Sequence, residues 1–338
     1  MKENQIKNIE NKQLNNKRTN LNSIDSFKCF LYSLVVPVLF SAAYTFIVMM
    51  LSYIFKIDYE VFTNHWLVKG CMYILNSAAF LCIFLYYYKK NNISFNDTIN
   101  IKTKFNAISI VITIALAFVL VFGFTNFINL VDYVYELMGY APSGDLPLKL
   151  NTLSNTLISI VLWALLPAIC EELLFRGIIF KGLTQKFKPL SAILLGGTMF
   201  MLMHGSLQQT VYQLVLGVVL CIVYYYTQNI FYPMLLHFLN NAIVIFMGFL
   251  QNESAISFNS AWSYIWPILV MLVAVGATVC LIIGLRYNTK NKYGNAIQTE
   301  YEVFKNEQNN LSNKWFIASF VVGIVFWVSN TVAGWFGY

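Results

Sequence analysis

The feature that most constrains this chain is a series of apolar segments, each roughly 17–27 residues long, separated by short polar stretches. A helix needs about 20 apolar residues to cross a bilayer, because each residue advances it by only about 1.5 Å. Helices also satisfy their own backbone hydrogen bonds in lipid. Of the 338 residues, 58% are hydrophobic and 11% charged, which excludes an ordinary soluble domain and a disordered chain. We therefore expect an all-α, polytopic bundle of transmembrane helices.

The apolar segments predict about nine spans and four regions. The spans are 28–55, 66–88, 105–131, 156–181, 189–205, 209–226, 230–249, 262–285 and 315–337. The regions are a disordered cytoplasmic head at 1–26, N-terminal helices with an external loop at 27–155, a central group of helices at 156–249, and C-terminal helices at 250–338 with a cytoplasmic loop at 286–314.

The distribution of charge predicts the orientation. Lys and Arg gather in the head and in the loops after the second, fourth and eighth spans, whereas the alternate loops are acidic or neutral. Because cytoplasmic loops carry the excess of Lys and Arg, we place the N-terminus in the cytoplasm and the C-terminus outside. The basic residues are not gathered with aromatic side chains on one face, which argues against nucleic-acid binding.

The fourth span contains Glu171, Glu172 and Arg176. A charge at the centre of a transmembrane helix costs roughly 2.5–3.5 kcal/mol on insertion scales, so these groups must face the protein interior, pair with each other or act. Glu172 and Arg176 are four residues apart and can form an ion pair, which leaves the Glu171 carboxylate on another face. Pro167 removes a backbone donor just before the charges and is expected to kink or open the helix there.

Two histidines follow on later spans. Between residues 189 and 252 there is no Asp, Glu, Lys or Arg, yet His204 and His237 both lie there. His237 is followed at helical spacing by Asn241, next to Asn240. One of these groups alone could be an interhelical hydrogen bond. Together they form an acid/base and hydrogen-bonding set, and we expect them to converge with Glu171 inside the bundle.

This set suits hydrolysis of a peptide bond by an activated water. A buried Glu beside a His can deprotonate water, and a second His with an amide can stabilise an oxyanion. Glu171, His204 and His237 could instead hold a divalent metal such as zinc, with one position left for water. The residues alone leave both mechanisms open. The chain contains neither HExxH nor GxSxG, which argues against the usual helical zinc pair and a serine nucleophile.

The motifs resemble those of the CPBP family of intramembrane proteases, which comprises CAAX prenyl proteases and bacteriocin-processing or abortive-infection proteins. The family patterns EExxxR, FxxxH and HxxxN occur here in order as Glu171-Glu172 with Arg176, as Phe200 with His204, and as His237 with Asn241. The resemblance covers roughly 156–249 and implies a catalytic core there. The flanking helices are not covered.

The resemblance implies an intramembrane peptidase, either a metalloendopeptidase or a glutamate-type protease. It assigns water activation to Glu171 with His204, structural support to Glu172 with Arg176, and the oxyanion hole to His237 with Asn241. The implied partners are membrane lipids and a protein or peptide substrate, in peptide processing or bacteriocin self-immunity. The Asn-, Lys- and Ile-rich composition is typical of AT-rich bacterial genomes and predicts a multi-pass protein of a bacterial cell membrane.

Two other functions fit parts of the pattern. In a proton-coupled transporter, Glu171 and the histidines would form a proton relay. A non-catalytic membrane immunity protein would keep the same core but act by binding. A protease requires that Glu171→Ala and His204→Ala each abolish cleavage, whereas a binding protein would retain its function in Glu171→Ala.

Overall fold

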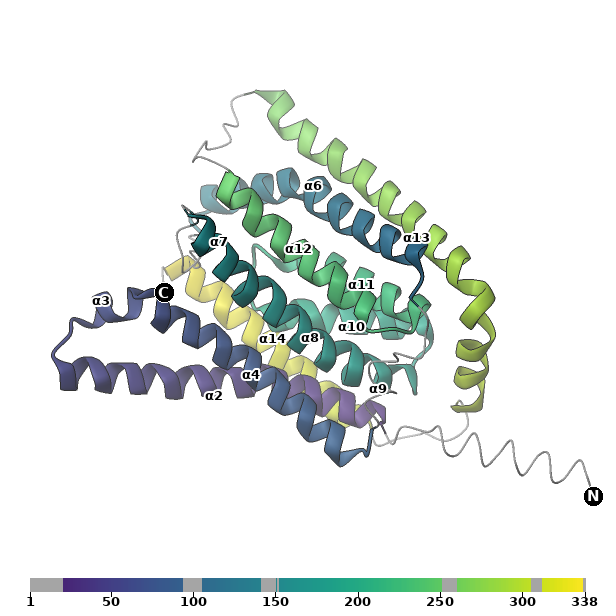
Figure 1. The fold of residues 1–338 in the computed structure, drawn as a ribbon, viewed down its shortest axis with the longest axis horizontal. Coiled ribbons are helices and arrows are strands. Elements are labelled where there is room, and N and C mark those ends of the chain that lie inside the picture. Colours follow the sequence, from purple (N-terminus) through teal and green to yellow (C-terminus); the bar gives the residue numbers. More distant parts are fainter. Residues whose placement is uncertain are drawn as a thin grey trace, which may run out of the picture.

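In a computed structural model, the chain forms a bundle of helices (Figure 1). The structure describes residues 21–93, 105–140, 150, 152–250, 260–304 and 312–336. Residues 1–20 of the predicted head and parts of several predicted loops lie outside these residues. The predicted disorder to residue 26 is wrong at its end, because a helix begins at Ser23, capped by Asn22, and buries Asp25 and Ser26. No strand occurs in the described part of the chain, so the predicted all-α polytopic bundle is confirmed.

The helices follow the apolar segments of the sequence. Their bounds are α2 Ser23–Phe55, α3 Tyr59–Asn64, α4 Trp66–Lys90, α6 Ala107–Leu137, α7 Leu153–Ser159, α8 Leu166–Leu174, α9 Lys181–Thr184, α10 Pro189–His204, α11 Thr210–Thr227, α12 Phe231–Leu250, α13 Ala261–Phe304 and α14 Ser312–Phe336, with two π-helical segments, η1 Ile160–Leu165 and η2 Phe175–Phe180.

Eight of the predicted spans correspond to described helices that are long and apolar enough to cross a membrane. The remaining one is α10, an apolar helix of 16 residues. At about 1.5 Å per residue it is roughly 24 Å long, shorter than the ~30 Å hydrocarbon core. Helix α13 continues to Phe304, past the predicted end of its span at 285, because hydropathy marks the end of the apolar segment and not the end of the helix.

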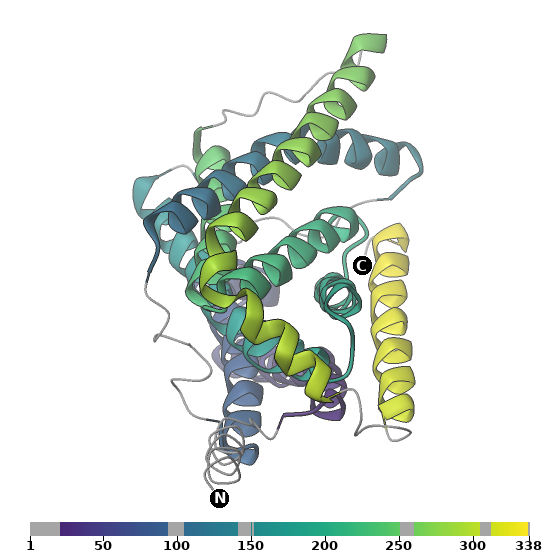
Figure 2. The ribbon, with the colours of Figure 1, turned by 90° about the vertical axis from the view of Figure 1, so that its right-hand side faces the viewer.

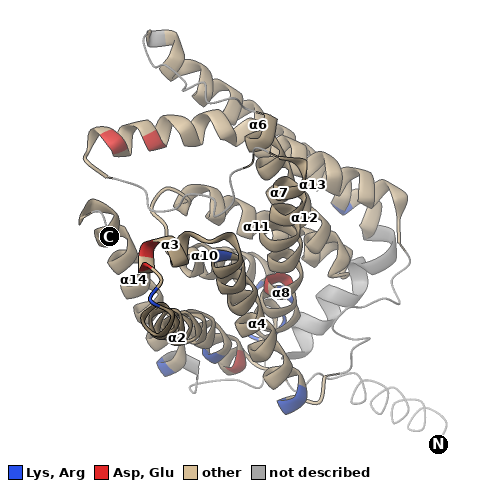
Figure 3. Cartoon of the chain, turned by 60° about the vertical axis from the view of Figure 1, so that its left-hand side comes forward, with Lys and Arg blue, Asp and Glu red and all other residues tan. Residues whose placement is uncertain are grey.

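Contacts between helix ends define two ends of the bundle. At the first, Lys90 at the end of α4 forms an ion pair with Asp25 at the start of α2 (2.6 Å), and Lys28 lies over the ring of Trp315 at the start of α14. At the second, Tyr140 packs against Trp335 near the end of α14. The last turns of α6, which carry two acidic residues, lie at this second end (Figure 3).

The fourth predicted span is one continuous helical stretch, 153–184, made of α7, η1, α8, η2 and α9. It is packed by α2, α4, α10 and α12, which lie around it in Figure 1. This central position explains why the span can carry charges, since protein and not lipid surrounds them. Figure 2 shows α14 at the edge of the bundle, where it packs on α10.

Candidate active site

The fourth predicted span departs from α-helical geometry on both sides of its two glutamates. Segment η1 precedes α8 and η2 follows it, so Glu171 and Glu172 lie on a short α-helix between two π-helical turns. Pro167 stands in the first turn of α8, directly after η1, where a proline is tolerated. The predicted opening of the helix before the charges is therefore present, as a π-helical segment.

A buried ionic cluster joins three of the predicted site residues. Arg176 Nη1 donates to Glu172 Oε1 at 2.8 Å, and Arg176 Nη2 donates to the carbonyl oxygen of Gly217 at 3.1 Å. His237 Nδ1 lies 2.9 Å from the same Glu172 oxygen. The side chains of Glu172 and Arg176 are fully buried, so the predicted ion pair forms inside the protein. The cluster joins α8, η2, α11 and α12.

The hydrogen-bond acceptors determine which ring nitrogen of each histidine carries a proton. A carboxylate only accepts, so His237 Nδ1 carries the proton that it shares with Glu172. His204 Nδ1 lies 2.8 Å from the carbonyl oxygen of Phe200, which also only accepts. His204 therefore presents Nε2 as a lone pair when it is neutral, and His237 can donate from Nε2 only as an imidazolium.

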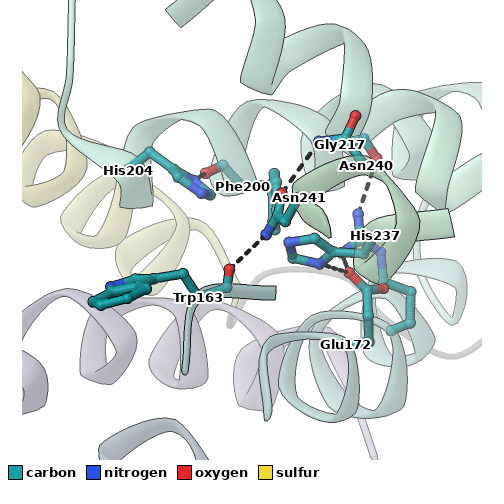
Figure 4. A network of polar contacts seen from close by, with 9 residues as sticks. Trp163, Glu172, Phe200, His204, Gly217, His237, Asn240 and Asn241 are labelled. Atoms are coloured by element: carbon teal, nitrogen blue, oxygen red, sulfur yellow. Dashed lines mark hydrogen bonds and ion pairs between the residues drawn. The ribbon is translucent and has the colours of Figure 1, made fainter. Parts of the chain in front are cut away.

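The Phe200 side chain links the two histidines. Its ring centroid lies 4.7 Å from that of His204 and 5.7 Å from that of His237. The guanidinium carbon of Arg176 lies 4.9 Å from the same ring, a cation–π distance. The phenylalanine of the second motif is thus a packing centre for the site, as Figure 4 shows for its position relative to His204 and Asn241.

The predicted amide belongs to a hydrogen-bonded chain. Asn241 Nδ2 donates to the carbonyl oxygen of Trp163 in η1 at 3.2 Å, and Asn240 Nδ2 donates to Asn241 Oδ1 at 3.2 Å. The hydroxyl of Tyr212 in α11 donates to Asn240 Oδ1. Figure 4 shows these amides beside His237.

Glu171 has a different environment from its neighbour. It is 9% exposed, and its Oε2 is buried without a hydrogen-bond partner. The charged groups that act on its carboxylate are His237, Glu172 and Arg176. Glu172 Oε2 is likewise buried without a partner, but Glu172 Oε1 is held by Arg176 and His237. Among the described residues, the structure thus shows one carboxylate held in ion pairs and one that is not, as the helical spacing predicts.

The six predicted residues therefore lie in one region but do not all touch. Glu172, Arg176 and His237 are in direct contact, and Phe200 connects them to His204. Asn241 lies one turn after His237, with its amide on η1.

The tentative metal ligands Glu171, His204 and His237 do not form a metal-binding group in this arrangement. Among the described residues, no three His, Cys, Asp or Glu side chains lie close enough together to hold an ion. His237 and His204 each use Nδ1 on a protein oxygen, and no direct contact joins either ring to Glu171. The residues as placed do not fit a metal.

Several contributors to the site could not be recognised from the sequence. Tyr212 and Asn240 act through hydrogen bonds, and Gly217 contributes only a carbonyl oxygen. Tyr212 is one of 21 tyrosines, and nothing in its local sequence distinguishes it. The free carbonyl oxygen of Trp163 could have been predicted from Pro167, because a proline has no N–H to donate to the carbonyl four residues earlier.

The fold and the site together define a multi-pass membrane protein with a polar cluster buried among its central helices. Residues 153–243 match the family model described as type II CAAX prenyl endopeptidase Rce1-like. This match confirms the resemblance to the CPBP group for the segment that carries all three motifs, which is less than a third of the chain. Searches of curated proteins and of solved structures found no match.

Proposed function

We propose that this protein is an intramembrane endopeptidase that hydrolyses a peptide bond of a membrane-associated protein or peptide. The observation that carries the proposal is the pair of adjacent buried glutamates with different environments. Each has one buried oxygen without a partner, but the other oxygen of Glu172 is held by Arg176 and His237, whereas no ion pair holds Glu171 among the described residues. A site that only needed structural ion pairing would have no use for the second carboxylate, since burying an unpaired charge is costly.

In the proposed reaction, Glu171 takes a proton from water while the water oxygen attacks the carbonyl carbon of the substrate. His204 holds this water through the lone pair on Nε2. The tetrahedral oxyanion accepts a hydrogen bond from Asn241 Nδ2, which has one N–H left after its bond to Trp163, and a second from His237 when that ring is an imidazolium. The C–N bond then breaks, and the proton on Glu171 passes to the leaving nitrogen.

The substrate class follows from the family model and is part of the proposal. Because the matching family is described as type II CAAX prenyl endopeptidases, we expect the substrate to be a lipid-anchored or membrane-inserted peptide. A bacterial cell membrane, with the N-terminus in the cytoplasm, remains our proposal for the location. A role in peptide processing or in self-immunity against a bacteriocin is compatible with the same chemistry.

The test is cleavage by the purified full-length chain in lipid nanodiscs. Internally quenched peptides, including farnesylated peptides that end in a CAAX sequence, are incubated with the wild type, Glu171→Ala and His204→Ala, and products are identified by mass spectrometry. We expect the wild type to cleave and both variants to lose cleavage, while Glu136→Ala, an exposed glutamate at the end of α6, remains active. Metal content is measured on the same samples.

The alternatives give different outcomes. Cleavage that persists in Glu171→Ala would remove our assignment of the base. A wild type that cleaves no peptide but moves protons across the membrane of closed lipid vesicles, into which it is reconstituted separately, would favour the transporter. Binding of a peptide without cleavage in both wild type and Glu171→Ala would favour the immunity protein. Thermal unfolding of each variant shows whether the chain is folded in the membrane.

A further inference from the structure

The amide of Asn241 is the end of a hydrogen-bonded chain that crosses three elements. Tyr212 on α11 donates to Asn240 on α12, Asn240 donates to Asn241, and Asn241 donates to the Trp163 carbonyl of η1. Tyr212 and Asn240 are buried, so water does not compete for these bonds. Of the residues joined by these hydrogen bonds, only Asn241 is a defining residue of one of the three motifs.

The Trp163 carbonyl lies where the helix loses a backbone donor at Pro167 and changes register: directly before it, the N–H of Leu166 donates to the carbonyl of Val161 in the π-helical register, and α-helical geometry begins with α8. In a regular helix, the N–H of residue 167 would donate to the carbonyl of residue 163, but proline has no N–H. The carbonyl therefore keeps a lone pair for a side-chain donor, and Asn241 Nδ2 lies 3.2 Å from it. The π-helical geometry of η1, directly before Pro167, belongs to the same interruption.

This carbonyl determines the direction of every bond in the chain. A carbonyl only accepts, so Asn241 must turn Nδ2 toward Trp163 and Oδ1 toward its neighbour. Asn240 must then present Nδ2 to Asn241 and Oδ1 to Tyr212, whose hydroxyl donates. A flip of the Asn241 amide would place two acceptors face to face at Trp163, which is strongly unfavourable in a buried site.

We propose that Pro167, Asn240 and Tyr212 are positioning residues that fix the amide of Asn241, so that its second N–H is held ready for the oxyanion. The proposal rests on the proposed function for the role of Asn241, but the geometry that it describes can be tested without a substrate. None of the three side chains needs to touch the substrate, and each acts through Asn241.

The kinetic test compares two prolines that interrupt helices. Pro167→Ala restores an N–H that competes for the Trp163 carbonyl and releases the Asn241 amide. We expect kcat on a cleaved farnesylated peptide to fall at least ~10-fold with KM unchanged, because oxyanion stabilisation acts in the transition state. Pro267→Ala in α13 restores an N–H in the same way, far from the site, and should leave kcat unchanged. A decrease in kcat that is no larger for Pro167→Ala than for Pro267→Ala would overturn the proposal.

Thermal stability separates positioning from a merely structural role. If Pro167 only supported the fold, its replacement would lower both Tm and kcat, whereas a positioning role predicts a lower kcat without a lower Tm. Replacing a proline in a helix by alanine favours the helix, so the Tm of Pro167→Ala should not fall below that of the wild type even though kcat falls. Tyr212→Phe removes only the donor hydroxyl and keeps the ring that packs near Phe124. We expect this variant to lower kcat by several-fold, again without a change in KM.

A thermal double-mutant cycle tests the chain of bonds without any substrate. Asn241→Ala leaves the Trp163 carbonyl without its side-chain donor in the wild-type chain, whereas in the Pro167→Ala chain the new N–H takes its place. Asn241→Ala should therefore lower the Tm more in the wild-type chain than in the Pro167→Ala chain. Equal shifts in both chains would overturn the proposal even if the protein cleaves peptides. If the wild type cleaves nothing, the proposed function fails, and this cycle alone still decides the arrangement.

Discussion

At the scale of the residue, the two adjacent glutamates give a sharp comparison, because the same substitution should destabilise the protein at one of them and leave its stability unchanged at the other. Glu172→Gln removes the carboxylate that neutralises the fully buried Arg176, and an unpaired buried charge costs about 3–5 kcal/mol. We expect this variant to unfold at a much lower temperature or to accumulate poorly. Glu171→Gln removes no ion pair and should keep the Tm of the wild type while it loses cleavage.

The comparison is made by thermal unfolding of both variants in the same detergent, followed by the cleavage assay on whichever protein is folded. Equal losses of stability for the two variants would mean that Glu171 is also held by a partner, and would remove the distinction on which its proposed role depends. Full cleavage by Glu171→Gln would contradict its role directly.

The residues of the site could be predicted from the sequence because charge is so rare in these segments. The spacing of Glu172 and Arg176 predicted their ion pair, which is present at 2.8 Å. The contact of His237 with Glu172 could not be predicted, because helical spacing relates residues of one helix and says nothing of the rotation of α12 relative to α8.

At the scale of the element, α10 and α11 approach closely through glycines. A Cβ on Gly217 would lie 3.1 Å from the backbone of Gly197 and 3.0 Å from the Cβ of Phe200. Small residues allow this kind of close approach between membrane helices. The contact also holds the Gly217 carbonyl against Arg176 and Phe200 against both histidines. The packing of these two helices therefore sets the geometry of the site.

We expect Gly217→Ala to separate α10 from α11 and to destabilise the protein by about 1–3 kcal/mol, the usual cost of overpacking a well-packed contact. Cleavage should fall as well, since Arg176 and Phe200 move with the helices. The control is Gly276→Ala in α13, where a Cβ would meet nothing within 4 Å. The Tm of the control should stay the same or rise, and a Gly217→Ala protein with unchanged Tm and activity would contradict this account.

The π-helical segments show what patterns of hydropathy cannot predict at this scale. Segment η1 consists of apolar residues, and η2 contains Arg176 and Gly177 among apolar residues, so both sequences are compatible with an ordinary helix. Pro167 indicated that regular hydrogen bonding is interrupted before α8, but not that the backbone adopts π-helical turns. The interruption after α8, at Phe175, has no such signal in the sequence. In the folded structure, Arg176 in this segment lies 5.9 Å from the ring of Phe175 and 4.9 Å from that of Phe200, contacts that hydropathy cannot predict.

At the scale of the whole molecule, the all-α bundle follows from the apolar segments alone. The lengths of the segments predicted nine spans; eight of them form described helices that could cross a membrane, and the fifth forms the shorter α10. What hydropathy cannot predict is the arrangement of these helices, because nearly every segment is apolar on all sides. Contacts such as that of the short α10 with α14 depend on the shapes of individual side chains, including Phe326 against Gly205.

The direction of two helices leads to the last prediction, which concerns the termini. Helices α2 and α14 begin at the same end of the bundle and run in parallel there, since Phe27 packs on Phe316 and Phe30 packs on Phe320. The start of α2 and the end of α14 therefore lie at opposite ends. The short α10 does not change the relative position of these helix ends, because α10 and α11 form a hairpin. The hairpin starts at the end where α2 begins, since Phe27 packs on Phe187 just before α10. It returns to the same end, since Tyr224 near the end of α11 packs on Phe180.

With the basic end in the cytoplasm, as positively charged loops favour, the C-terminus should lie outside. In a bacterial host, a phosphatase fused after Tyr338 should be active because it folds only outside the cytoplasm, whereas a fluorescent protein that folds only in the cytoplasm should be bright at the N-terminus and dark at the C-terminus. Reporters that place the N-terminus and the C-terminus on the same side of the membrane would contradict the parallel arrangement of α2 and α14. Opposite sides with the reverse assignment would leave the helix packing intact and show that the charge bias does not set the orientation. In that case the first turns of α10 and the last turns of α11 would face the exterior.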